Sequence, residues 1–344
     1  MLAQMRKVAG ALLLVTFLVV MACAGLAQQL SIYEIQSNTV DGDASIYHLE
    51  VVDCAGGICV GKYPGTRPRL ILRDPNQVGG WAGIQVKDWI YPFDMFNDVQ
   101  IGDRVELSNM LVEEYLGTTF LQRQSAYNPV YNILSQGNPL PPPTIVSVDQ
   151  IPAPLYVPDH PNGPGWYVEN HDAEPFESMR LVVRDVLVTQ MDLGKALDNY
   201  NLADQAGNDC WATDYMNVDV DDWGYHPFVG YEQHFCAVAG VFEQYTRLST
   251  RWDYYQLVTL DTPDLAICGD GNNDGTAATD DLPRYAECLV GPQCDDLPAG
   301  CPVPAWTADP PGLAVMQCIM MDLDYDGDID LRDFAQFQLI VETP

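Results

Sequence analysis

The sequence predicts a mainly β protein, in which two tandem five-stranded β-barrels are followed by a small α-helical module. Short alternating apolar and polar runs fill residues 29–138 and are separated by glycine, asparagine, aspartate and proline turns, which is typical of antiparallel strands. A similar pattern returns in residues 176–262. Residues 264–344 are acidic instead and contain two matching loop-and-helix patterns. The length of 344 residues, with 47% apolar content, allows several separate cores.

The first 27 residues have the pattern of a secretory signal peptide. Arg6 and Lys7 precede an apolar run over residues 8–22, and small residues around Ala27 offer a cleavage site. The run is too short for a convincing membrane span, and no later stretch is long and apolar enough to form one. We therefore expect a secreted, extracellular protein. The alternative is a lipid anchor attached through Cys23.

The chain has ten cysteines, of which nine remain once Cys23 leaves with the signal peptide; these are expected to form disulfides, because secretion places them in an oxidising compartment. Cys54 and Cys59 flank a glycine pair, which suggests a local bridge. Cys210 and Cys236 are expected to pair within the second barrel. A further bridge would link two cysteines of the acidic region, Cys294 and Cys301. A zinc site is the disfavoured alternative, because the chain has no C-x-x-C pair and its histidines are not clustered.

The first barrel is predicted over residues 29–138. Five short strands in about a hundred residues are typical of a small Greek-key barrel, the OB-fold. The expected strands are Ser45–Val52, Pro68–Leu72, Gly83–Val86, Arg104–Val112 and Thr118–Gln122.

A proline-rich linker is expected over residues 139–175, since its many prolines favour a semi-rigid spacer that runs over the surface. The second barrel, residues 176–262, has the pattern of a weak repeat of the first. Trp211 falls where Trp81 falls, and Val241–Tyr245 matches Leu111–Tyr115 at the same offset.

This half of the chain resembles the OB-like modules found beside nucleases and phosphoesterases in secreted bacterial proteins. The residues that carry the resemblance are Leu70–Asp74, Trp81–Ile84, Gly102–Val105 and Leu111–Leu116. These motifs are structural, so the resemblance implies a fold and assigns no catalytic residue.

Two twelve-residue stretches, which we name loop 1 (residues 270–281) and loop 2 (residues 322–333), have the spacing of EF-hand-type calcium loops. Both place oxygen side chains at positions 1, 3, 5 and 12, with glycine at position 6. Position 7 offers a backbone carbonyl. The predicted ligands are Asp270, Asn272, Asp274, Thr276 and Asp281 in loop 1, and Asp322, Asp324, Asp326, Asp328, Asp330 and Asp333 in loop 2. We expect two Ca²⁺ sites, and loop 2, which has more carboxylates, should bind more tightly.

Each loop is followed by a helical pattern, since the residues after Asp281 and Asp333 are apolar at the same offsets. The duplicated loop and exiting helix resembles a type I dockerin, the calcium-dependent docking module of secreted bacterial polysaccharide-degrading complexes. The resemblance implies a cohesin-like or cell-surface protein partner. Positions 10 and 11 of the loops are Thr279-Asp280 and Leu331-Arg332, which match neither each other nor the usual dockerin pair.

The net charge of −32 would repel polyanions and attract divalent cations. Nucleic acid is therefore not expected as a partner. The chain contains aromatic residues that could form a ligand platform, although packing in a core or an interface is the favoured interpretation of these residues. A carbohydrate ligand fits an acidic, aromatic surface better than a nucleic acid does. The aromatic candidates are Trp81, Trp89, Tyr91, Trp211, Tyr215, Trp223, Tyr225, Tyr254 and Tyr255.

Catalysis has little support in the sequence. His226 and His234 lie close to Asp219, Asp221 and Asp222, but a solvated acidic loop explains this cluster better than an acid–base site does. The sequence contains no nucleophile elbow, phosphate-binding glycine loop or metalloprotease helix. The predicted function is a secreted, non-enzymatic, calcium-binding protein, whose dockerin-like module docks it to a protein or surface and whose barrels bind a ligand or act as spacers. The alternative is an extracellular hydrolase or hydrolase subunit acting on nucleic acid, phosphoesters or glycans.

Overall fold

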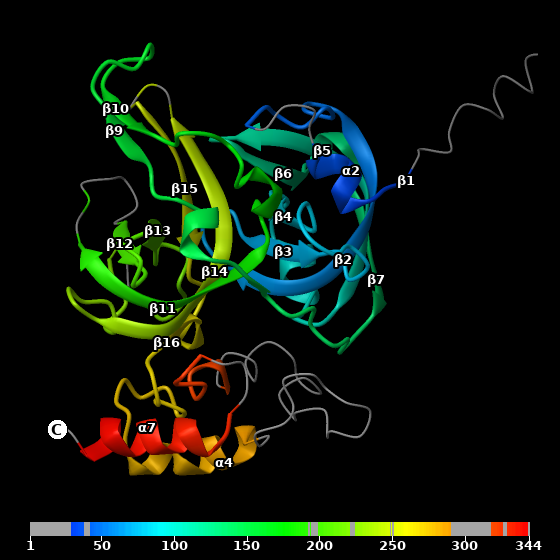
Figure 1. The fold of residues 1–344 in the computed structure, drawn as a ribbon. Helices are drawn as coiled ribbons and strands as arrows, with labels where there is room; N and C mark the ends of the chain where they lie inside the picture. The colour runs from blue at the N-terminus through cyan, green and yellow to red at the C-terminus, as the bar shows by residue number, and fades with distance from the viewer. Residues whose placement is uncertain are drawn as a thin grey trace, which may run out of the picture.

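The protein is mainly β, as predicted. Figure 1 shows two sheets side by side and a small helical module beneath the second of them. The structure, a computed structural model, describes residues 29–37, 42–191, 193, 199–220, 224–247, 249, 251–289, 318–325 and 329–342. The predicted signal peptide and Cys23 lie outside the described residues. None of the described helices is long and apolar enough to cross a membrane.

The first sheet is built on five strands whose pairing returns to its starting strand. The strands are β2 (Val51–Tyr63), β3 (Arg69–Arg73), β4 (Gly83–Asp88), β5 (Arg104–Tyr115) and β6 (Thr118–Arg123). The order is β2-β3-β4-β6-β5, and β5 pairs again with β2. Two further strands, β1 (Gln29–Leu30) and β7 (Val130–Ser135), extend this sheet along β2 and β5. Two short helices, α3 (Asp94–Asp98) and η1 (Ser125–Tyr127), lie in its loops.

The first predicted strand is misplaced. Residues 45–50 form turns or irregular structure, and β2 begins at Val51. The Ser45 side chain explains why: its hydroxyl donates a hydrogen bond to the backbone carbonyl of Ile35, which favours a turn over a strand. Alternation over eight residues therefore predicts the wrong element for residues 45–50, where a side-chain hydrogen bond to the backbone decides the local structure.

The second sheet repeats the pairing order of the first. Its strands are β11 (Arg180–Gln190), β12 (Tyr200–Ala203), β13 (Asp209–Thr213), β14 (His234–Arg247) and β15 (Trp252–Val258). The order is β11-β12-β13-β15, and β14 pairs with both β15 and β11. The predicted repeat thus has a counterpart in strand order. A short strand, β16 (Leu265–Ala266), continues from β14 toward the helical module.

The segment expected to be a surface linker contributes to the second sheet. It contains β8 (Thr144–Ile145), β9 (Leu155–Val157), β10 (Gly165–Tyr167) and two 3₁₀ turns, η2 (Val148–Gln150) and η3 (Glu174–Phe176). The pairs β8–β11 and β1–β2 are both parallel. Each of these two short strands is followed by a helical turn that begins with a capping box. After β1, Ser31 and Glu34 cap α2 (Ile32–Gln36). After β8, Ser147 and Gln150 cap η2 in the same way. The repeat therefore begins earlier in the chain than the predicted second barrel.

Two disulfides lie among the described residues, Cys236–Cys268 and Cys288–Cys318. The predicted Cys54–Cys59 bridge is wrong, because both cysteines are buried, unbridged and five residues apart on one strand. An extended strand would separate their α carbons by about 16 Å, more than double what a disulfide spans.

The predicted Cys210–Cys236 bridge is also wrong. Cys210 is free and packs in the core of the second sheet, whereas Cys236 belongs to the cluster that faces the helical module. Its neighbour Phe235 points into the core, as the alternation of a strand requires. Cys294 and Cys301 lie outside the described residues.

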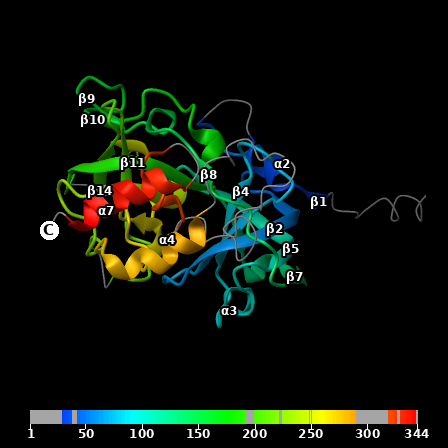
Figure 2. The same cartoon turned by 60° about the horizontal axis from the view of Figure 1, so that its bottom comes forward.

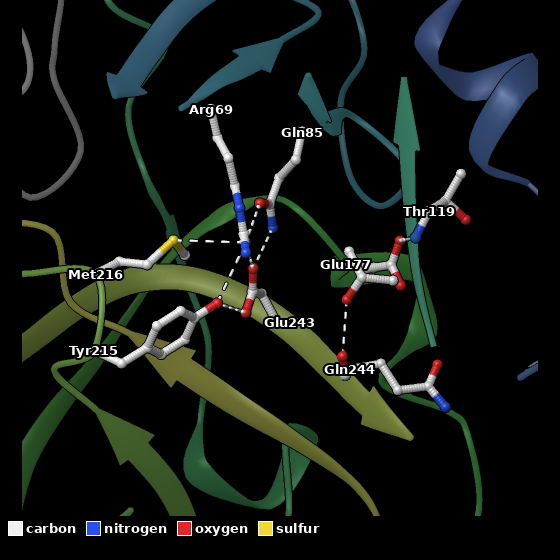
Figure 3. A network of polar contacts seen from close by, with 9 residues as sticks. Arg69, Gln85, Thr119, Glu177, Tyr215, Met216, Glu243 and Gln244 are labelled. Carbon is white, nitrogen blue, oxygen red and sulfur yellow. Dashed lines mark hydrogen bonds and ion pairs between the residues drawn. The ribbon is translucent and has the colours of Figure 1, made fainter. Parts of the chain in front are cut away.

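A buried polar network joins the two sheets (Figure 3). Arg69 of β3 lies 2.8 Å from Glu243 of β14, measured from Nη1 to Oε1, and the same oxygen accepts a hydrogen bond from Gln85 of β4 at 2.7 Å. The hydroxyl of Tyr215 donates to the other Glu243 oxygen. Glu243 is 4% exposed, so its charge depends on these partners rather than on water.

A second contact between the sheets brings three carboxyl groups together: Glu114 of β5, Glu174 of η3 and Glu177 just after η3. Glu177 is buried, and one of its oxygens accepts the backbone N–H of Thr119 at 3.0 Å. Burial raises the pKa of Glu177 well above its usual range, and repulsion from Glu174 and Glu114 raises it further. Burial also raises the pKa of Glu114 to about 7. Above pH 4.5, Glu177 and Glu114 therefore hold protons more readily in the folded protein than in the unfolded chain.

Glu177→Gln should stabilise the protein more at pH 8 than at pH 5. The raised pKa of Glu177 contributes stability that is fully present below its unfolded pKa, 4.5, and is lost as the pH rises toward its folded pKa, which burial places well above 4.5. Glu114, whose pKa is about 7, also loses its proton between pH 5 and 8 and adds repulsion. Glutamine keeps the acceptor for Thr119 and removes the charge. Urea unfolding of both proteins from pH 5 to 8 measures the effect, and a difference that is constant across this range would contradict it.

Candidate metal centre

The acidic C-terminal region folds as a compact module on the second sheet. It contains η5 (Thr262–Asp264), η6 (Thr279–Asp281), α4 (Leu282–Cys288) and α7 (Leu331–Glu342). Figure 2 shows α4 and α7 running alongside each other in front of β11 and β14. Pro283 occupies the first turn of α4, where its missing N–H leaves no hydrogen bond unmade. A helix therefore follows each of the two predicted loops.

Loop 1 is folded around its carboxylates. Asp270 is buried and accepts the backbone N–H groups of Asp274 at 3.0 Å and Gly275 at 2.7 Å. Gly275 has φ +94°, the left-handed conformation that position 6 requires for the turn. Asp281, at position 12, is also buried and accepts from Asn272 at 2.9 Å and from Ala278 at 2.7 Å. The pKa values of Asp270 and Asp281 are raised, chiefly by burial.

Loop 2 repeats the contacts of position 12. Asp333, at position 12, accepts the N–H groups of Asp324 at 3.2 Å and Asp330 at 2.8 Å. These donors are at positions 3 and 9, as are Asn272 and Ala278 in loop 1. The residues at position 4 also match, since Asn273 has φ +61° and Tyr325 has φ +59°. The duplicated sequence pattern therefore corresponds to matching backbone geometry at positions 3, 4, 9 and 12 of the loops.

Three loop 2 carboxylates converge. Asp322, Asp324 and Asp333 each place an oxygen within 4.8 Å of the other two. Among the described residues, this is the grouping of acidic, histidine and cysteine side chains compact enough to surround one ion. Hard cations such as Ca²⁺ prefer such oxygen ligands. The predicted ligands Asp326 and Asp328 lie outside the described residues.

The two exiting helices pack through equivalent positions. Tyr285 and Phe337 each lie four residues after position 12, and their rings stack with centroids 6.0 Å apart. The Tyr285 hydroxyl donates to the carbonyl of Asp330, at position 9 of loop 2. The Cys288–Cys318 disulfide then links the end of α4 to the segment before loop 2. The two loops are thus held in one unit.

The module also shares a hydrophobic cluster with the second sheet. Val182, Ala237, Ala239 and Ala266 of β11, β14 and β16 pack against module residues that include Met320 and Phe337. The Cys236–Cys268 disulfide joins β14 to the residue two before loop 1. This attachment buries one face of the module. The sequence pattern predicts a separate domain over residues 264–344 and does not predict this contact.

Sequence reasoning missed Arg184, which lies beside loop 2, and the contact that Tyr325 of loop 2 makes with it. Arg184 of β11 donates to Asp322 at 2.6 Å, and its guanidinium lies 5.2 Å from the centre of the Tyr325 ring. The sequence could indicate the position of Arg184 only through the alternation of β11, which places Arg184 on the same face of the strand as Val182.

The two candidate histidines have different surroundings. His226 is buried and lies 3.0 Å from the Thr262 hydroxyl, whereas His234 is exposed and pairs with Asp185 at 2.7 Å. Asp221, Asp222 and Trp223 lie outside the described residues. Most of the remaining aromatic candidates are packed in cores or interfaces, as Trp211, Tyr254 and Tyr255 are. Tyr91 is exposed, and Arg67 stacks on Trp89.

No protein-family model and no curated protein matches the chain. Among solved structures, a murine DNA-binding protein bound to double-stranded DNA is 11% identical, with 60% of this chain and 88% of that chain covered and a TM-score of 0.28. Fission yeast Pot1 with single-stranded DNA is 10% identical, with 61% and 78% covered and a TM-score of 0.24. A replication protein A heterotrimer bound to single-stranded DNA is 10% identical, with 68% of each chain covered and a TM-score of 0.21.

These similarities contradict the partner prediction made from charge. Nucleic acid was not expected, yet the proteins above are all described with DNA. We therefore withdraw the prediction that nucleic acid is not a partner. We also withdraw the predicted protein and carbohydrate partners. TM-scores this low carry no function over to this chain.

Proposed function

We propose that the chain is a secreted calcium-binding protein, in which two tandem OB-like barrels carry a dockerin-like module with two Ca²⁺ sites. In this proposal calcium has a structural role: it fixes the module in its folded form on the second barrel. The observation that carries the proposal is the match between the two loops. In both, the carboxylate at position 12 accepts the N–H groups of positions 3 and 9.

The charge of the module supports a bound divalent cation. From residue 264 onward the chain has 16 acidic and two basic residues. Asp270, Asp281 and Asp333 are fully buried, and a buried carboxylate is costly unless it is paired or coordinates an ion. Calcium would offset the repulsion among these groups, so part of its binding free energy would be folding free energy.

The contacts between the module and the second sheet favour a module that is fixed to the sheet, rather than a docking tail that moves freely. One disulfide, one ion pair and one shared hydrophobic cluster join the module to that sheet. A module held this way can stiffen the protein without an external partner.

We expect millimolar Ca²⁺ to raise the melting temperature of the full chain, whereas Mg²⁺ at the same concentration should raise it much less. Mg²⁺ demands a smaller, regular octahedral site and keeps its waters, while calcium accepts the flexible ligand set of a twelve-residue loop. Thermal unfolding of the chelated protein, with either ion added back, measures the effect. Equal shifts with both ions would point to general charge screening and would overturn the calcium assignment.

A further inference from the structure

The second sheet places a cation on a predicted calcium ligand. Nη2 of Arg184 lies 2.6 Å from Oδ2 of Asp322, the residue at position 1 of loop 2. The Arg184 side chain is 20% exposed and that of Asp322 is 7% exposed, so this ion pair is screened less than a surface pair.

Arg184 is held in place by its surroundings. Its guanidinium lies over the ring of Tyr325, the position 4 residue of the same loop. The Tyr325 hydroxyl lies 3.5 Å from Cys236 Sγ and 3.8 Å from Cys268 Sγ, beside the disulfide that joins the module to β14. The positive charge is therefore fixed relative to the loop and cannot easily swing away.

We propose that Arg184 is a built-in countercharge that sets the calcium affinity of loop 2. Without an ion, it neutralises one of the three converging carboxylates, Asp322, Asp324 and Asp333, and reduces their mutual repulsion. When Ca²⁺ binds, both positive charges act on Asp322 and repel each other. Arg184 thus stabilises the ion-free loop more than the ion-bound loop and weakens calcium binding, as reciprocal linkage requires. The inference rests on the calcium sites proposed above.

Loop 1 differs in this respect. The oxygens of Asp270, its position 1 residue, accept backbone N–H groups from the loop itself. Arg284 of α4, which lies near Gly271, pairs with Glu287 at 2.7 Å. The charge of Arg184 would therefore make loop 2 weaker than its carboxylate count implies, while loop 1 keeps the affinity set by its own ligands.

The test is a calcium titration of the full chain by calorimetry, with Arg184→Gln, Arg184→Lys and Arg180→Gln. Arg180 is the matched control, because it lies on the same strand and pairs with Asp264, outside both loops. We expect Arg184→Gln to tighten calcium binding at loop 2 about tenfold, the size expected for one nearby charge acting on a divalent ion. Arg184→Lys, which keeps the charge, and Arg180→Gln should leave the affinity unchanged.

Thermal unfolding in a chelator gives a second readout, in which Arg184→Gln should lower the melting temperature of the ion-free protein. Weaker or unchanged calcium binding in Arg184→Gln, with normal binding in the unaltered chain, would overturn this inference alone. A lack of calcium binding in the unaltered chain would overturn the proposed function and this inference together.

Discussion

Asp333→Ala should abolish calcium binding at loop 2 and destabilise the module even without the ion. Asp333 is fully buried and accepts three backbone N–H groups, those of Leu323, Asp324 and Asp330. Alanine would leave these donors without an acceptor, at a cost of about 1–3 kcal/mol for each that stays buried. It would also remove the ligand that closes the calcium shell, so we expect the affinity to fall by more than about 100-fold.

Two further variants separate ligation from folding. Asp333→Asn keeps an acceptor oxygen and should retain most of the ion-free stability, yet it should still lose calcium at loop 2. Asp280→Ala removes an exposed carboxylate at a position that is not a ligand, and it should bind calcium normally at loop 2. Calorimetric titration and thermal unfolding measure both effects. Calcium binding by Asp333→Ala that equals that of the unaltered chain would rule out loop 2 as a site.

Glu243→Ala should cost about 3–5 kcal/mol of unfolding free energy, the usual effect of removing one partner of a buried ion pair. Arg69 would keep its charge at the interface between the sheets and lose the carboxylate at 2.8 Å. Gln85 and Tyr215 would lose their acceptor as well.

The matched control is Glu113→Ala, because Glu113 is the counterpart of Glu243 in the sequence repeat and is half-buried on β5. We expect Glu113→Ala to cost less than about 1 kcal/mol, as for most partly exposed positions. Chemical denaturation of both variants measures the difference. Similar losses in the two proteins would mean that the network of Figure 3 does not tie the sheets together.

The longer strands and their repeat could be predicted because alternation over five or more residues reports burial on one face. β3 and β5 begin within one residue of their predicted starts, and β14 contains the predicted repeat of β5. Strands of two or three residues, such as β8 and β9, are too short to show alternation of apolar and polar residues. The sequence therefore predicts a spacer for the segment that contains them.

The loop residues of the candidate site could be predicted because their spacing is local, and a single turn brings positions 1 and 12 together. The attachment to the second sheet could not. That attachment depends on two contacts between residues far apart in the chain. Arg184 lies 138 residues from Asp322, and Cys236 lies 32 residues from Cys268, so the fold of β11 and β14 brings the partners together. Disulfide partners likewise follow from the fold, and the spacing of the cysteines alone does not determine them.

Counting bound calcium tests the proposed sites most directly. The full chain would be dialysed to equilibrium against micromolar to millimolar Ca²⁺, and the ion would be measured in the protein compartment by atomic absorption. We expect two ions per chain at saturation and one in Asp333→Ala, with the remaining ion lost when Asp281→Ala is added. Saturation at zero ions, or two ions retained in the double variant, would show that the loops are not calcium sites.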